Sequence, residues 1–245
     1  MIKRFCVHWG SLPLLFATLL FWAACTDPED DSDPTERIDF NGHDYVDLAL
    51  PSGLLWATCN VGAESPEEYG DYFAWGETEP KSDYSLDTYK YCNDTEGYSF
   101  SKYVTDSEYG DYGKIDNKTA LESSDDAATA NWGGSWRMPT YEEWQELCET
   151  CKWTWTSHCD VDGYKVTSVR NGNSIFLPAA GCRNDTGINN AGSNGEYWSS
   201  SVHEPFPDNA WFLHFTSRNQ FAFYYYAPLY SYRYHGRSIR PVCVP

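Results

Sequence analysis

Positive charge is scarce in this chain. Its 245 residues contain 17 Lys and Arg against 36 Asp and Glu, which gives a formal charge of −19. Proteins that bind nucleic acid need basic side chains to neutralise phosphates, so this balance argues against a nucleic-acid partner. Lysine is absent after Lys165, and residues 166–245 hold four acids and six arginines, so the acidity is concentrated earlier in the chain.

Long hydrophobic runs are absent after residue 24, which excludes a protein with several membrane-spanning helices. Two basic residues precede the one apolar run, Leu12 to Trp22, and a pair of alanines and Cys25 follow it. This order is typical of a secretory signal peptide over residues 1–24. It resembles a bacterial lipobox, in which the cysteine becomes the lipidated N-terminus, although Trp22 stands where an aliphatic residue is usual. An uncleaved anchor helix is the alternative, but His8, Gly10 and Pro13 interrupt it.

The segment behind Cys25 is acidic and contains no hydrophobic side chain up to Pro34. Like charges repel and prolines extend a chain, so residues 25–38 are predicted to be a tether that holds a domain away from the membrane. The run of acids resembles the export signal of lipoproteins that gut Bacteroidota display on the outer membrane. We therefore expect a lipid-anchored protein that faces the cell exterior, with a plain solvated linker as the alternative.

Residues 39–245 are predicted to form one α+β domain of mostly antiparallel strands. The clearest helix is expected at about 141–151, because Thr140 and Glu143 make a capping box and the apolar residues after it recur on one face. A shorter helix is expected near 125–131. Residues 79–118, rich in Tyr, Asp, Ser and Gly, are predicted to be a long surface excursion.

Several turns divide the predicted strands. Asn41-Gly42 accepts the positive φ angles of a tight hairpin turn. After the principal helix, strands are expected at 153–161, 164–169 and 174–179, joined by turns at Asp162-Gly163 and Asn171-Gly172.

Three segments carry a resemblance to a known family: residues 45–63, residues 132–144 and the C-terminal Gly236-Arg-Ser-Ile-Arg-Pro-Val242. Together they resemble the Fibrobacter succinogenes major paralogous domain family of Bacteroidota lipoproteins. The resemblance implies a C-type-lectin-like fold, similar to that of formylglycine-generating enzymes. Those enzymes use a closely spaced cysteine pair late in the chain. Here only Cys182 and Cys243 follow Cys159, so we expect no catalysis and no cofactor.

The sequence contains two sets of residues that could bind a metal. Cys148, Cys151, His158 and Cys159 could supply a tetrahedral zinc site. A buried or disulfide-bonded set of cysteines is the competing interpretation, which an exported protein favours. Asp160 and Asp162 suggest a calcium loop, but a hairpin turn accounts for them and calcium needs six to eight oxygens. No metal site is therefore predicted.

Aromatic residues are unusually dense near the C-terminus, with 14 between residues 197 and 235. In residues 210–215, alternation can direct Trp211, Leu213 and Phe215 to the core and the residues between them outward. Both faces of these strands carry aromatic residues, however, which is more than one packed face requires. An exposed binding face is therefore predicted, with core packing plus incidental surface exposure as the alternative. Tyr and Trp mixed with small polar residues are typical of binding surfaces. The predicted ligand-binding residues are Trp211, Phe212, His214, Arg218, Tyr224, Tyr226, Tyr230 and Tyr232.

The sequence thus predicts a non-catalytic surface lipoprotein that is attached to the membrane only through a lipid on Cys25. Its expected partner is an extracellular glycan or protein. A structural or assembly role in the cell envelope is the alternative, and a metal-dependent enzyme related to formylglycine-generating enzymes is a more remote one.

Overall fold

The computed structural model describes residues 39–94, 96, 99–218 and 231–244, and these form mostly antiparallel β-sheets with few short helices. The signal peptide, Cys25 and the acidic tether lie outside the described residues. Within the described ranges, no helix is long and apolar enough to span a membrane.

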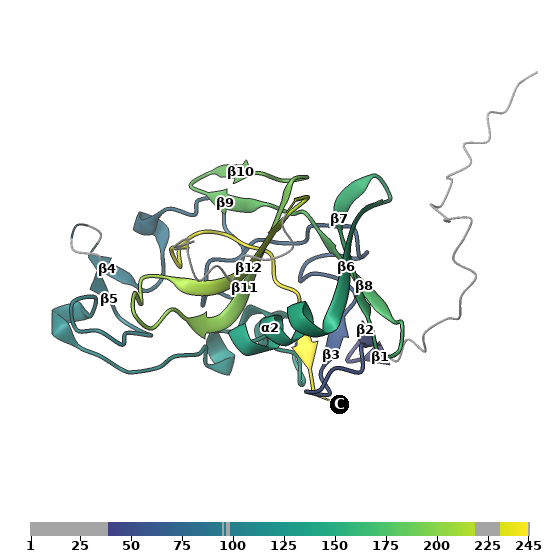
Figure 1. Cartoon of the computed structure of the whole chain (residues 1–245). Coiled ribbons are helices and arrows are strands. Elements are labelled where there is room, and N and C mark those ends of the chain that lie inside the picture. The colour runs from purple at the N-terminus through teal and green to yellow at the C-terminus, as the bar shows by residue number, and fades with distance from the viewer. Residues whose placement is uncertain (1–38, 95, 97–98, 219–230, 245) are drawn as a thin grey trace, which may run out of the picture. The chain divides into compact units, whose positions relative to one another are not determined.

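The first sheet joins the two ends of the domain. It contains β1 (Asp39–Phe40), β2 (His43–Asp47), β3 (Leu55–Ala57) and β13 (Val242–Cys243), in that order (Figure 1). Asn41 and Gly42 connect β1 to β2 with φ angles of 53° and 84°, so the predicted hairpin is confirmed.

The described residues contain two α-helices, α1 (Ala127–Trp132) and α2 (Tyr141–Thr150), and single 3₁₀ turns at Leu86–Thr88, Asp111–Gly113 and Ser123–Asp125. The capping box of α2 is present, with Thr140 and Glu143 in the predicted roles. Arg137 donates to both carboxylate oxygens of Glu143, at 2.7 and 2.6 Å, and fixes the entry of the helix. Both predicted helices are confirmed, although Cys151 begins the following strand.

The strands after α2 form a meander of β6 (Cys151–His158), β7 (Val161–Ser168) and β8 (Ser174–Pro178). The predicted turn at Asp162-Gly163 is wrong, because Cys159 and Asp160 make the turn with φ angles of 46° and 63°. Gly163 lies inside β7, where a Cβ atom would collide with the carbonyl oxygen of Leu177. The glycine is required by this close approach of two strands and not by a turn.

Three further hairpins are present in the part of the domain that the structure describes: β4 (Cys92–Asp94) with β5 (Ser99–Phe100), β9 (Cys182–Asn184) with β10 (Gly187–Asn189), and β11 (Asn194–Val202) with β12 (Ala210–Thr216). Helix α2 packs against β11 and β12 (Figure 1). The β11–β12 hairpin separates two clusters of buried side chains. Neighbouring residues on one strand therefore enter different clusters, as Tyr197 and Trp198 do.

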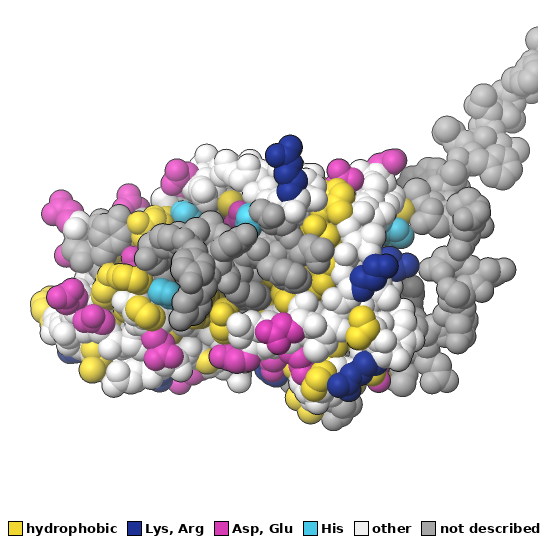
Figure 2. All heavy atoms as spheres, in the orientation of Figure 1, with side chains coloured by type: hydrophobic (Ala, Val, Ile, Leu, Met, Phe, Trp, Pro, Cys, Tyr) yellow, Lys and Arg dark blue, Asp and Glu magenta, His cyan; other side chains and the backbone are white. Residues whose placement is uncertain are grey.

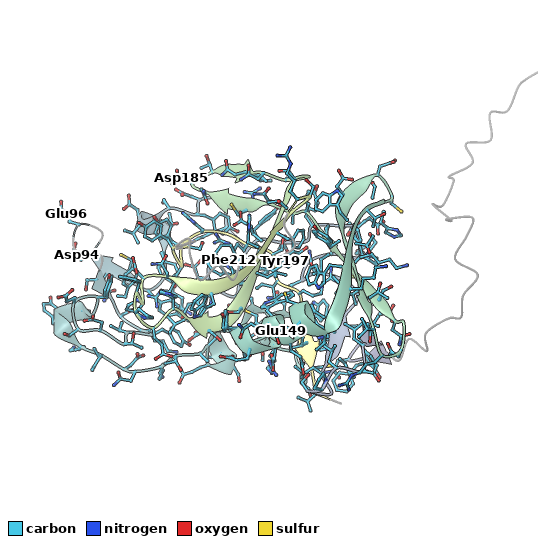
Figure 3. All side chains as sticks on the ribbon, in the orientation of Figure 1. Asp94, Glu96, Glu149, Asp185, Tyr197 and Phe212 are labelled. Carbon is cyan, nitrogen blue, oxygen red and sulfur yellow. The ribbon has the colours of Figure 1, made fainter. Side chains whose placement is uncertain are left out.

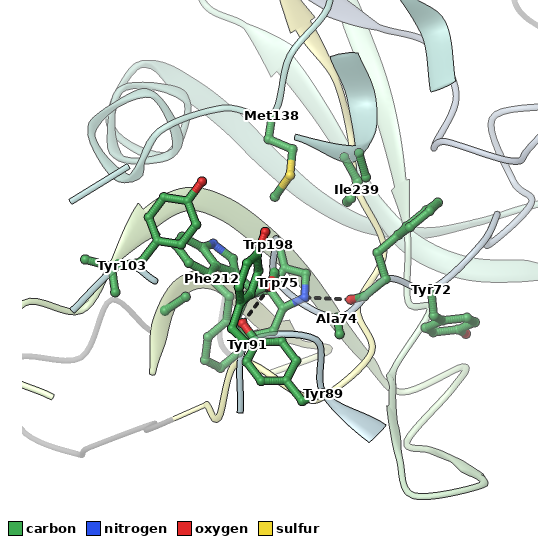
Figure 4. Packing of buried hydrophobic residues seen from close by; sticks show 14 of the residues in the cluster. Tyr72, Ala74, Trp75, Tyr89, Tyr91, Tyr103, Met138, Trp198, Phe212 and Ile239 are labelled. Carbon is green, nitrogen blue, oxygen red and sulfur yellow. Dashed lines mark hydrogen bonds between the residues drawn. The ribbon is translucent and has the colours of Figure 1, made fainter. Parts of the chain in front are cut away.

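We call these the first and second core clusters. The first contains Val61, Tyr72, Phe73, Ala74, Trp75, Tyr84, Tyr89, Tyr91, Phe100, Tyr103, Val104, Ala127, Ala128, Met138, Trp198, Val202, Ala210, Phe212 and Ile239 (Figure 4). The second contains Val46, Leu48, Leu50, Leu54, Trp56, Trp144, Leu147, Cys148, Trp153, Tyr164, Val166, Ile175, Leu177, Ala179, Tyr197, Leu213, Phe215 and Val242.

The segment 79–118, predicted to be a surface excursion, also contributes to the core. It has little regular structure, but Tyr89, Tyr91, Phe100 and Tyr103 are buried in the first core cluster. Their hydroxyls explain why tyrosine suits these positions. Tyr89 donates to the carbonyl of Trp75 at 2.8 Å and Tyr91 to that of Gly76 at 3.0 Å. Each ring therefore buries apolar surface in the core while its hydroxyl group keeps a hydrogen-bond partner.

Asp125 anchors this segment from the side of α1. Its carboxylate accepts from the hydroxyl of Tyr103 at 2.7 Å, from Lys90 at 3.1 Å and from Lys102. Burial alone would raise the pKa of Asp125, but hydrogen bonds from Lys102, Tyr103 and other neighbours hold it well below its usual range. The ionised form of this side chain therefore stabilises the fold.

Asp125→Asn should both weaken the domain and flatten its response to acid. Loss of hydrogen bonds to a charged acceptor should lower the free energy of unfolding at pH 7 by about 2 kcal/mol. In the wild type, the contribution of Asp125 is complete above about pH 5 and is lost as the pH falls below the unfolded-state pKa of about 3.9 toward the folded-state value. Urea unfolding at pH 7, 5 and 3 measures both effects. Equal slopes against pH for the two proteins would contradict this role.

The last described segment carries arginines into the interior. Arg233, Arg237 and Arg240 have exposed fractions of 0%, 4% and 0%. Arg240 donates to Asn60 at 2.9 Å and to the carbonyls of Ala57 and Thr58. Three of the six arginines of residues 166–245 are therefore buried. The charge counted from the sequence of this region is not the charge that its surface presents.

Candidate ligand-binding face

The structure changes the predicted ligand-binding set. Tyr224, Tyr226 and Tyr230 lie outside the described residues. Phe212 was predicted to face the ligand, and this is wrong, because it is 6% exposed and packs in the first core cluster (Figures 3 and 4). The guanidinium of Arg237 lies 4.1 Å from the centre of its ring.

The expected alternation along β12 is confirmed for Leu213 and Phe215, which are buried, and fails at Phe212 for a physical reason. The rule that every second residue faces solvent holds only when one face of a sheet is open. The β11–β12 hairpin lies between two clusters, so Phe212 enters the first while Leu213 and Phe215 enter the second. Trp211, predicted to face the core, is half-buried, as is His214.

A row of aromatic rings extends from Trp211 in both directions, and we call it the aromatic row: Tyr141, Trp211, His203 and Phe206. The ring centres of Tyr141 and Trp211 are 4.5 Å apart, and those of His203 and Trp211 are 4.6 Å apart. The rings of His203 and Phe206 are stacked at 5.6 Å with an interplanar angle of 4°. Phe206 is 39% exposed and the other three are half-buried, so the row borders solvent.

Regular structure positions this row. Tyr141 is the first residue of α2, and its backbone N–H donates to Ser201 on β11 at 3.1 Å. The hydroxyl of Ser199 donates to the carbonyl of Trp211 at 2.8 Å. The N–H of His203 donates to the carbonyl of Asn209 at 3.0 Å, which closes the loop between β11 and β12. The rings are therefore held in place before any ligand arrives.

A second group of rings lies beside the start of β12 and consists of Tyr232, Tyr234 and His235. Tyr232 and Tyr234 are stacked at 5.1 Å with an interplanar angle of 10°, and the rings of Tyr234 and His235 are 4.7 Å apart. Tyr232 forms a β-bridge with Asn209, two residues before Trp211. Of the predicted residues, Trp211 and Tyr232 are thus held by neighbouring backbone segments.

Histidines on this side of the domain are uncharged at neutral pH. Burial lowers the pKa of His203 and of His214. Burial and the charge of Arg237 together lower the pKa of His235 to about 3. A neutral imidazole offers one donor and one acceptor, and Nε2 of His214 lies 3.4 Å from the side-chain amide of Asn194. Arg218 is exposed at the end of β12. Figure 2 shows hydrophobic, acidic and histidine side chains interspersed on one face of the molecule.

A pocket of about 450 Å³ lies elsewhere, lined by Gly70, Asp71, Tyr72, Pro80, Lys81, Ser82, Tyr84 and Arg183. The guanidinium of Arg183 lies 5.5 Å from the centre of the Tyr72 ring, and Lys81 pairs with Glu77 at 2.9 Å. The sequence did not predict this pocket, because its positively charged residues, Lys81 and Arg183, are about a hundred positions apart and no local motif connects them.

The four residues considered as a possible zinc site do not all come together. Cys151 begins β6 and His158 ends it, so the two are about 23 Å apart at about 3.3 Å per residue. Cys148 is buried in the second core cluster, and burial raises the pKa of its thiol. Free thiols are present at Cys59, Cys92, Cys148, Cys151, Cys182 and Cys243. Cys148 and Cys151 are therefore free thiols, the first buried and the second half-buried, which is one of the alternatives that the sequence left open.

Comparison of this chain with protein-family models, with curated proteins and with solved structures found no match. The resemblance in the sequence therefore stays a prediction, and the candidate face rests on its own geometry.

Proposed function

We propose that this protein is a surface-exposed, non-catalytic lipoprotein that binds an extracellular glycan or protein through its aromatic row. In this proposal Cys25 carries the lipid, residues 25–38 form the tether and residues 39–245 form a C-type-lectin-like domain. The protein is attached to the outer membrane and faces the exterior.

The observation that supports binding is the fixed ring-to-ring packing of the aromatic row at the protein surface. Rigid Trp, Tyr and Phe rings present a large contact area and lose little conformational entropy when a ligand binds. The apolar faces of sugars and the side chains of a protein partner both pack on such rings. Neutral His203 adds hydrogen bonding without the cost of removing a charge from water.

The domain organisation also suits a lectin-like fold. β3 pairs with β13, so the two ends of the domain meet in one sheet. The Arg-Met-Pro-Thr segment before α2 makes the capping box and the Arg137–Glu143 pair. The Gly236–Val242 segment supplies the buried arginines Arg237 and Arg240. Each of the motifs that carried the resemblance thus has a structural role.

Trp211→Ala and Phe206→Ala should each weaken ligand binding at least tenfold, because each removes a large aromatic contact surface from the aromatic row. The full chain would be tested against a glycan array and against surface extracts of neighbouring cells, and the affinity of each variant would be measured on the ligand found. The Tm of Phe206→Ala should stay within a few degrees of the wild type, since this side chain is partly exposed.

Tyr112→Ala is the matched control, because Tyr112 is 92% exposed and lies outside the aromatic row. It should bind as the wild type does. Equal affinity in Phe206→Ala, Trp211→Ala and Tyr112→Ala would contradict the assignment of the face.

An assembly role in the cell envelope is the alternative function. Protease treatment of intact cells separates the two, because an outward-facing domain is digested while a periplasmic control protein survives. Protection of the domain would favour the envelope role.

A further inference from the structure

The turn between β6 and β7 brings together three side chains that can bind a metal, and none of them belongs to the aromatic row. Nε2 of His158 lies 3.8 Å from Oε2 of Glu67. The donor atoms of Glu67, His158 and Cys159 all lie within 4.8 Å of one another. This set shares His158 and Cys159 with the zinc site that the sequence suggested, but it replaces the two distant cysteines with a carboxylate.

Both sides of this cluster are held by the fold. His158 ends β6 opposite Val161, and its ring packs at 5.5 Å from that of Phe176. Cys159 follows in a left-handed conformation, with φ at 46°. Such a conformation is unfavourable for any residue other than glycine or asparagine, so the turn holds the cysteine at a cost in backbone energy.

Glu67 approaches from a loop about ninety residues earlier in the chain. This loop is closed by the N–H of Asp71, which donates to the carbonyl of Val61 at 2.9 Å. The side-chain amide of Asn60 donates to the carbonyl of Tyr69 at 2.9 Å and fixes it from inside. The carboxylate therefore meets the turn as part of an ordered loop.

We propose that Glu67, His158 and Cys159 form a Zn²⁺ site with one further coordination position open to solvent. Donor atoms at about 2.0 to 2.3 Å from a tetrahedral zinc lie about 3.3 to 3.8 Å from one another, so the observed cluster needs only small side-chain movements. One sulfur, one imidazole and one carboxylate suit zinc, whereas magnesium and calcium prefer oxygen ligands alone. On binding, the thiol of Cys159 releases its proton to solvent and the thiolate coordinates the metal.

The side chains of His158 and Glu67 are 41% and 23% exposed, so the metal would be reached directly from solvent. A zinc ion there would join the Glu67 loop to the β6–β7 hairpin. Its open position would accept water or a donor atom of an external ligand.

The full chain, purified under reducing conditions and treated with a chelator, would be titrated with Co²⁺ and then with Zn²⁺. We expect one equivalent of Co²⁺ to produce a near-ultraviolet thiolate charge-transfer band, which Zn²⁺ displaces. Cys159→Ser should abolish the band, and His158→Gln and Glu67→Gln should weaken Zn²⁺ binding at least tenfold. Zinc should raise the Tm of the wild type but not that of Cys159→Ser.

Cys151→Ser is the control, because it removes a half-buried thiol from the opposite end of β6. It should bind Zn²⁺ as the wild type does. The proposal is overturned if the wild type binds no stoichiometric metal, or if Cys159→Ser retains the band. X-ray absorption at the zinc edge of the wild type gives a test that needs no variant. A shell with one sulfur and one imidazole supports the site, and an all-oxygen shell refutes it.

Discussion

Replacing Glu196 with glutamine should remove a large part of the stability of this domain. Glu196 pairs with Arg237 at 2.9 Å, and the two side chains are 9% and 4% exposed. The guanidinium also lies 4.3 Å from the ring centre of Trp198 and 4.1 Å from that of Phe212. Glutamine would leave a positive charge buried among aromatic rings without a counter-ion.

Breaking one side of a buried ion pair costs about 3 to 5 kcal/mol, against a total stability of about 5 to 15 kcal/mol for a typical domain. Urea unfolding at pH 7, followed by tryptophan fluorescence, measures the loss. Glu204→Gln is the control, since this acid is exposed in the loop after β11, and it should change the stability by less than about 0.5 kcal/mol. The double variant Glu196→Leu with Arg237→Met should recover part of the loss, because no charge then remains buried. Similar losses in Glu196→Gln and Glu204→Gln would contradict the importance of the pair.

Trp144→Ala should destabilise the second core cluster by about 3 to 5 kcal/mol, the usual cost of truncating a buried aromatic residue. Trp144 is fully buried, and its ring centre lies 4.8 Å from that of Trp56. Its indole N–H donates to the carbonyl of Trp198 at 3.2 Å, which connects α2 to β11. The variant would lose packing and one hydrogen bond at the contact between the helix and the hairpin.

Trp155→Ala makes the same chemical change at a half-buried position on β6. Because part of the Trp155 ring is already exposed to solvent, its truncation should cost about half as much or less. Thermal and urea unfolding of both variants give the comparison. Equal losses of stability in the two variants would show that burial does not determine how much Trp144 contributes to the free energy of unfolding.

Local chemistry explains where the sequence predicted structure well. The Asn41–Gly42 turn and the Thr140–Glu143 capping box each depend on residues within four positions of one another. The same reasoning failed at Asp162-Gly163, since a glycine in a turn and a glycine under a neighbouring strand look alike in sequence. Only the position of Leu177 on β8 distinguishes the two.

The candidate face shows more clearly where prediction from local sequence fails. The sequence selected Trp211 and Tyr232 as candidates, but it placed Phe212 on the surface and did not select Tyr141, His203 or Phe206. A strand buried on both sides carries aromatic residues at consecutive positions, and so does a strand with an aromatic binding face. Which of the two holds at Phe212 depends on the first core cluster, whose members are spread over residues 61–239.

By itself, the sequence determined the antiparallel α+β character, the capped helix and the first hairpin, because turn and capping residues act through their own backbone. The tertiary structure alone decided that residues 79–118 supply core tyrosines, that three C-terminal arginines are buried, and that Glu67 meets His158 and Cys159. Those features depend on contacts between segments far apart in the chain. The free energy of such contacts comes from shared burial, which no local pattern records.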